Sequence, residues 1–196
     1  MAKLDTESKT RSLIVEAFWR LYQTGPIENI TVKQIAALAG VSRVTFYEYF
    51  RNVRDILTQI EEEILTDLQL ISRNHEPASR EIAAARMGKI IRFSQNYRDY
   101  AAVLLSDDGD PQFAKQVKNI FRPMVDACCL AQTKVVGRER DILREFYVSG
   151  LLAAISTWLK EAGDMDIERF TYFIIESVLT PPRQEASSAF DAQSDS

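Results

Sequence analysis

The chain has 196 residues, of which 46% are hydrophobic and 27% charged, so it can bury a sizeable core and is not a disordered polymer. Its 7 glycines and 6 prolines are too few for the turns of a many-stranded β-sandwich or barrel. No apolar run approaches the ~20 residues of a membrane helix, and the residues after Met1 lack the apolar core of a signal peptide. We therefore expect an all-α protein of the cytoplasm with no membrane partner.

The rarest residue types limit the chemistry of any site. The single histidine, His75, cannot build a zinc site of two or three histidines, and adjacent Cys128 and Cys129 have no second pair to complete a metal site. We expect no metal and no cofactor, and we interpret the cysteines as small buried helix residues, with redox sensing as the alternative. No activated nucleophile or paired acid and base is visible, so a helical enzyme is the disfavoured reading.

Charge is distributed unevenly along the chain. Residues 1–54 contain eight Lys or Arg and five Asp or Glu, so this segment carries +3 while the remainder carries −7. A basic segment on an acidic body is typical of a protein that touches phosphate at one end only.

Capping patterns predict two short helices joined by a tight corner. Thr31 and Gln34 have the spacing of a capping box, which predicts a helix beginning directly after Thr31. Gly40 is placed to take a positive φ at the end of that helix, and Ser42 is a good N-cap for a second helix over Arg43–Phe50. This arrangement predicts a helix-turn-helix, whose second helix enters the major groove of DNA; an ordinary helical hairpin is the alternative.

Longer helices flank this pair. Apolar residues from Leu13 to Tyr22 recur at helical spacing before Gly25-Pro26, and Asn52 is placed to cap a helix that follows.

The whole stretch from Ile30 to Phe50 resembles the TetR/AcrR family of transcriptional regulators. The resemblance implies a homodimer with an N-terminal three-helix helix-turn-helix DNA-binding domain on a larger C-terminal helical bundle that binds a small molecule and dimerises.

On this basis we expect a DNA-binding domain at 1–52, a ligand-binding and dimerisation domain at 53–180 and a disordered tail at 181–196. Two positions depart from the family pattern. Val44 replaces a small residue, and its methyl groups suit contact with a thymine methyl. Val53 replaces a phosphate-binding lysine, for which Arg51 or Arg54 is the candidate substitute.

Arg43 is the candidate for direct base readout, since a guanidinium bridges O6 and N7 of guanine; a phosphate clamp is its alternative role. Val44 and Thr45 are next in reach, and hydroxyls and cations nearby are expected at the DNA backbone. The full predicted set of DNA contacts is Thr31, Lys33, Ser42, Arg43, Val44, Thr45, Tyr47, Tyr49, Arg51 and Arg54.

The chain after residue 58 is predicted to form a helical bundle, because its apolar residues recur at helical spacing. Pro123 is expected to kink or interrupt its helix. The resemblance implies a ligand pocket, for which the scarcity of cations on the stripes favours an apolar or amphipathic effector; ordinary core packing is the alternative. The candidate pocket residues are Met87, Phe93, Tyr97, Phe121, Met124, Phe146 and Tyr147.

The last two helices are expected to pair with their copies in a homodimer, and small residues there permit close approach. Packing within one chain is the alternative. The candidate interface residues are Gly150, Leu151, Ala154, Ile155, Trp158, Phe170, Phe173 and Ile174.

The sequence thus predicts a ligand-responsive repressor on a palindromic operator; the alternative is a helical protein-interaction module that has lost DNA binding.

Overall fold

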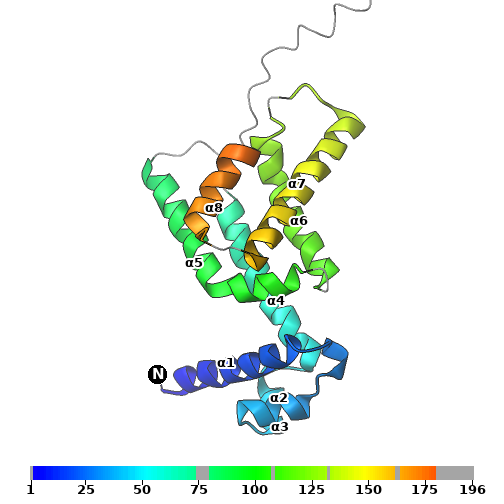
Figure 1. Ribbon diagram of the computed structural model, residues 1–196. Coiled ribbons are helices and arrows are strands. Elements are labelled where there is room, and N and C mark those ends of the chain that lie inside the picture. Colours follow the sequence, from blue (N-terminus) through cyan, green and yellow to red (C-terminus); the bar gives the residue numbers. More distant parts are fainter. Residues whose placement is uncertain (1, 74–79, 107–108, 132, 162–163, 180–196) are drawn as a thin grey trace, which may run out of the picture. The chain divides into compact units, whose positions relative to one another are not determined.

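A computed structural model of the chain describes residues 2–73, 80–106, 109–131, 133–161 and 164–179. All regular structure in these ranges is helical, which confirms the predicted fold class (Figure 1). The chain divides into two compact units, Met1–Asp67 and Leu68–Ser196, and the division falls inside a helix. The expected domain boundary after residue 52 stays a prediction. The expected tail at 181–196 and His75 lie outside the described residues.

The N-terminal unit is a small helical cluster around aromatic and aliphatic side chains. Its elements are α1 (Ala2–Tyr22), the 3₁₀ turn η1 (Ile27–Asn29), α2 (Val32–Ala39), α3 (Arg43–Tyr49) and most of α4 (Val53–Ser72). Helix α2 packs against both α1 and α3. The most deeply buried side chains of this unit are Ile14, Phe18, Ile35, Phe46, Phe50, Ile56 and Ile64.

Arg11 ties α1 to α4 within this unit. Its Nη2 donates to Oε1 of Gln59 at 3.1 Å and to Oε1 of Glu63 at 2.5 Å. Its guanidinium carbon also lies 5.6 Å from the ring centre of Phe50, the residue that ends α3. One side chain on α1 therefore contacts both α4 and the end of the helix that precedes it, and this restrains α3.

The C-terminal unit is a helical bundle. Its elements are α5 (Arg80–Leu104), α6 (Pro111–Cys128), α7 (Gly137–Lys160), α8 (Ile167–Ile174) and the π-helical turn η2 (Ile175–Leu179). Helix α7 packs against α5 and α6, and α8 packs against α5 (Figure 1). Two core clusters hold it together: Val125, Cys129, Leu130 and Val148 form one, and Leu151, Trp158, Phe170 and Ile174 form the other.

A kink or an interruption is expected at Pro123, and the interruption is wrong, because α6 continues through it from Pro111 to Cys128. Pro123 is exposed, so the carbonyl of Asn119 that loses its helical donor lies on a side open to water. The start of α6 is fixed by Asp110, whose Oδ1 accepts N–H bonds from Gln112 and Phe113 at 2.7 and 3.3 Å.

The adjacent cysteines have different surroundings. Cys129 is buried in the first core cluster, as expected, whereas Cys128 is exposed; neither is in a disulfide. Desolvation raises the pKa of both thiols, that of Cys129 to about 11, so the reactive thiolate is scarce near neutral pH. This favours the structural interpretation over redox sensing.

Ion pairs join α6 to α7. Lys118 and Arg122 each contact the Glu145 carboxylate, at 2.8 and 3.3 Å, and the Ser149 hydroxyl donates to it at 2.9 Å. The hydrogen bond from Lys118, followed by that from Ser149, lowers the pKa of Glu145 to about 2. The ionised carboxylate is thus the form that the folded protein favours.

We expect this group to give the C-terminal unit an acid-sensitive stability. A carboxyl whose pKa is lower in the folded chain stabilises the fold above the pKa of the unfolded chain, and that contribution is lost as pH falls from about 5 to about 2. Glu145→Gln should flatten the stability profile in this window, as measured by thermal unfolding at several pH values. Glu161→Gln, at an exposed position after α7, is the control, and an unchanged profile for Glu145→Gln would contradict the assignment.

Candidate nucleic-acid interface

The corner between α2 and α3 has the predicted geometry. Thr31 and Gln34 form the capping box: the Gln34 N–H donates to Thr31 Oγ1 at 3.3 Å and the Thr31 N–H to Gln34 Oε1 at 2.9 Å. Gly40 ends α2 with φ of 68°, a left-handed conformation that a β-branched residue resists. The N–H of Val41 then donates back to the carbonyl of Ala36 at 3.0 Å, which closes the turn.

Helix α3 has one buried side and one exposed side. Phe46 is fully buried, and Phe50 follows it into the core at a ring-centre distance of 5.9 Å. On the other side Arg43 is exposed, while Val44 and Tyr47 are 73% and 58% exposed. Large apolar side chains held in the open on a short helix are suited to contact with another molecule.

Several predicted hydroxyl groups already have partners within the chain. Ser42 caps α3 by accepting the Thr45 N–H at 3.0 Å, and the two hydroxyls lie 3.0 Å apart. The Thr31 hydroxyl donates to Gln34 at 2.7 Å. These side chains shape the helix starts, whereas Thr45 and Tyr49 are only half-exposed. The capping roles predicted for Thr31 and Ser42 are formed in the structure, and their contact with DNA stays a prediction.

The cations of the N-terminal unit differ in their availability. Lys33, Arg43 and Arg51 are exposed and form no ion pair with any residue that the structure describes. Arg54 instead pairs with Glu28 at 3.5 Å, although both side chains remain largely exposed. The backbone N–H of Arg51 is held by the Asp55 carboxylate at 2.8 Å, just before α4 begins. Arg51 is therefore the better candidate to replace the missing lysine at Val53.

Two short helices, a left-handed glycine between them and an exposed second helix flanked by cations define a helix-turn-helix DNA-binding unit. Family models match in both units: residues 14–60 match "Bacterial regulatory proteins, tetR family", and residues 85–178 match "Transcriptional regulator C-terminal region". This chain belongs to the tetR family and is a DNA-binding transcriptional regulator, as the sequence predicted.

Solved structures agree on the fold. A TetR transcriptional regulator from Streptococcus agalactiae 2603V has 24% identity and a TM-score of 0.60, covering 91% of this chain and 98% of its own. The fatty acid degradation regulator FadR from Bacillus halodurans has 16% identity and a TM-score of 0.54, covering 89% and 96%. The dihydroxyacetone kinase operon activator DhaS has 16% identity and a TM-score of 0.51, covering 86% and 96%. No curated protein matches the sequence.

The predicted pocket residues differ in their surroundings. Phe121 and Met124 pack against the second core cluster, and Tyr147 against the first. Phe93 and Tyr97 are half-buried with ring centres 5.1 Å apart, and Met87 is half-buried too. The expectation for Phe146 conflicts with the structure, in which this side chain is 71% exposed, because α7 turns it away from both clusters.

The predicted interface residues fall on both sides of the last two helices. Leu151, Trp158, Phe170 and Ile174 form the second core cluster, so they have almost no surface to offer a second copy, and their assignment to the interface conflicts with this burial. Ala154 and Ile155 are half-buried against that cluster. Gly150 is exposed, and Phe173 is 50% exposed.

The exposed side of α7 has a pattern that the sequence interpretation missed. Ile142, Phe146, Gly150, Ala153 and Thr157 recur at helical spacing and are all exposed, so we call them the α7 stripe. A Cβ added at Gly150 would meet nothing within 4 Å. Among the described residues, α7 alone is long and apolar enough to cross a membrane by length and composition. Helix α7 is apolar both on the side that packs into the core and along the exposed α7 stripe, and this explains its apolar composition.

Proposed function

We propose that this regulator is a repressor that binds a palindromic operator as a homodimer and releases it when a small molecule binds. The observation that carries the proposal is α3, whose Arg43, Val44 and Tyr47 are exposed beside the unpaired cations Lys33 and Arg51. Occupancy of an operator is sufficient for repression, whereas activation needs a further contact with the transcription machinery. Such a protein acts in the cytoplasm, where the chromosome lies.

In this proposal the exposed side chains divide into two roles. Arg43 and Val44 lie in the first turn of α3, the part of a recognition helix that meets base edges, and they supply donors for guanine and methyl groups for thymine. Lys33 and Arg51 lie outside that turn and supply phosphate contacts, which add affinity without sequence preference.

We expect Arg43→Ala to reduce sequence discrimination and Lys33→Ala to weaken all duplexes alike. Loss of a bidentate guanine contact costs ~1–3 kcal/mol, which reduces the preference for the operator about fivefold to 150-fold. Loss of one phosphate contact lowers the slope of log affinity against log salt by ~0.9. Binding titrations on operator and scrambled duplexes at several salt concentrations measure both effects.

Two outcomes of these titrations would decide against the proposal. An equal loss on every duplex for Arg43→Ala would make Arg43 a phosphate clamp and leave base readout to Val44 and its neighbours. Absence of binding to genomic fragments at low salt would reject the repressor and favour the protein-interaction module.

Dimerisation is proposed on the α7 stripe. Its large residues, Ile142 and Phe146, lie toward the start of the helix, and the small ones, Gly150 and Ala153, follow toward its end. Small side chains allow two helices to approach closely while large ones fill the space beside them. Phe173 and Tyr172 on α8 add further exposed apolar surface. A symmetric pair formed this way carries two copies of α3, which implies an operator with two inverted half-sites.

A further inference from the structure

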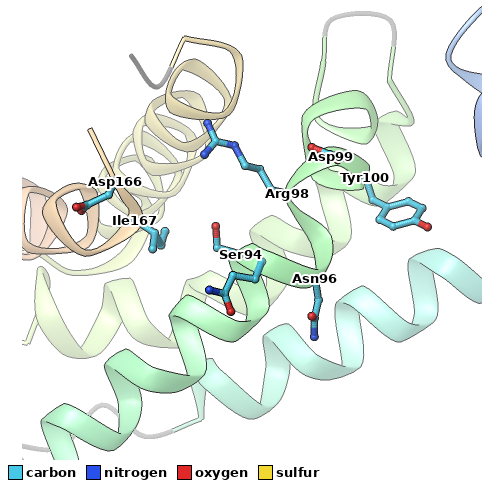
Figure 2. Close-up of a pocket in the computed structure, with 8 residues that line it drawn as sticks. Ser94, Asn96, Arg98, Asp99, Tyr100, Asp166 and Ile167 are labelled. Atoms are coloured by element: carbon cyan, nitrogen blue, oxygen red, sulfur yellow. The ribbon is translucent and has the colours of Figure 1, made fainter. Parts of the chain in front are cut away.

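A cavity with both polar and apolar lining lies within the C-terminal unit. It is formed by the segment Ser94–Tyr100 of α5 and by Asp166 and Ile167 at the start of α8, and its volume is about 350 Å³ (Figure 2). This lies at the lower end of the range for small-molecule sites, ~300–1,000 Å³. Tyr97, one of the residues predicted to bind an effector, lies in the segment that forms the cavity but is not among its lining residues.

Arg98 is the one cation among the residues that line the cavity. It forms no ion pair or hydrogen bond with any described residue. Its guanidinium carbon lies 4.6 Å from the ring centre of Trp158. Stacking on an aromatic face holds a guanidinium in place but leaves the N–H donors at its edge available, and these match a planar anion.

The surface beneath Arg98 is itself fixed. Trp158 donates through Nε1 to the carbonyl of Met165 at 2.8 Å and stacks on Phe170 at a ring-centre distance of 4.9 Å. Arg98 therefore rests on a buried, hydrogen-bonded ring. A donor held in place before a ligand arrives loses less conformational freedom on binding.

The other groups of the cavity select the kind of anion. Ser94 lies four residues before Arg98, on the same side of α5, and Ile167 adds an apolar wall from α8. Asp166 accepts the Arg169 N–H at 2.8 Å, and in Figure 2 its carboxylate points away from Arg98. Asp99 adds a second nearby acid, which disfavours a ligand of high negative charge.

The geometry points to an organic monocarboxylate as the ligand of this cavity, with its carboxylate on the Arg98 guanidinium and the Ser94 hydroxyl and its short carbon chain against Ile167. A single negative charge matches the one cation among the lining residues, and an apolar chain matches the isoleucine. The role of this ligand as the effector rests on the proposed function. Its binding to the cavity does not depend on that function.

The test is isothermal titration calorimetry of the full chain with hexanoate. Hexanoate should bind, whereas 1-hexanol, which lacks the charge, and inorganic phosphate, which lacks the chain, should bind at least tenfold more weakly. Arg98→Gln should weaken hexanoate binding about tenfold to a hundredfold, since a hydrogen bond to a charged group is lost. Arg98→Lys should fall between the two because it retains the charge without the planar fork.

Arg92→Gln, an exposed arginine on α5 outside the cavity, is the matched control and should bind hexanoate like the parent chain. Circular dichroism and thermal unfolding establish that each variant is folded. The inference is overturned if hexanoate does not bind, if phosphate or hexanol binds equally well, or if folded Arg98→Gln binds like the parent. If hexanoate binds through Arg98 but leaves operator affinity unchanged, the site stands and its role as effector site fails.

Discussion

Gly150→Leu is expected to give a folded chain that no longer dimerises and whose operator affinity falls ~10²- to 10⁴-fold, the gain that linking two binding modules supplies. The added side chain would stand where two copies of α7 approach. Within one chain the position is exposed, and an added Cβ has no neighbour within 4 Å. Leucine also has a higher helix propensity than glycine, by up to ~1 kcal/mol, so the helix itself is not weakened.

Sedimentation velocity measures the association state, and operator titration measures the affinity. Gly150→Ala is the graded control, since its single methyl group should disturb the pair far less. A Gly150→Leu chain that still sediments as a dimer would place the interface elsewhere and reject the α7 stripe.

Phe46→Ala is expected to destabilise the N-terminal unit by ~3–5 kcal/mol and to abolish DNA binding. The Phe46 ring is fully buried, with its centre 5.9 Å from that of Phe50 and 5.4 Å from that of Tyr47. Its removal leaves a cavity beneath the helix that carries Arg43. Since a domain has only ~5–15 kcal/mol of stability, this loss leaves the unit marginal.

The measurement is thermal or urea unfolding with probes in both units. The N-terminal unit should unfold earlier in Phe46→Ala, while the C-terminal unit and the dimer are retained. Phe46→Leu, which keeps most of the apolar volume, should show a smaller shift. Operator binding by Phe46→Ala at the parent affinity would show that α3 is not supported by this ring.

Local signals explain why the helix-turn-helix could be predicted closely. The Thr31–Gln34 capping box, the Ser42 cap and the positive φ at Gly40 all depend on residues within four positions of one another. Such hydrogen bonds form in the same way whatever the rest of the chain does. Pro123 shows the limit of local rules, because its effect depends on whether the freed carbonyl lies on an open side of the helix.

The orientation of α7 could not be predicted by the same means. Leu151 and Trp158 face the core, whereas Phe146 and Gly150 face outward, although all four lie among apolar neighbours in the sequence. A helix that is apolar on most sides has no periodic contrast to mark its inner face. Only the packing partners, here Phe170 and Ile174 on α8, decide which residues are covered.

The sequence alone determined the class of protein, because the caps, the glycine corner and the short second helix with cations before and after it are set by neighbours along the chain. The tertiary structure decided which groups are available, since availability depends on distant residues. Glu28 pairs with Arg54 but leaves Arg51 unpaired, and Trp158 on α7 supports Arg98 on α5 beside a cavity. These contacts join segments more than 20 residues apart, and chain folding alone brings such segments together.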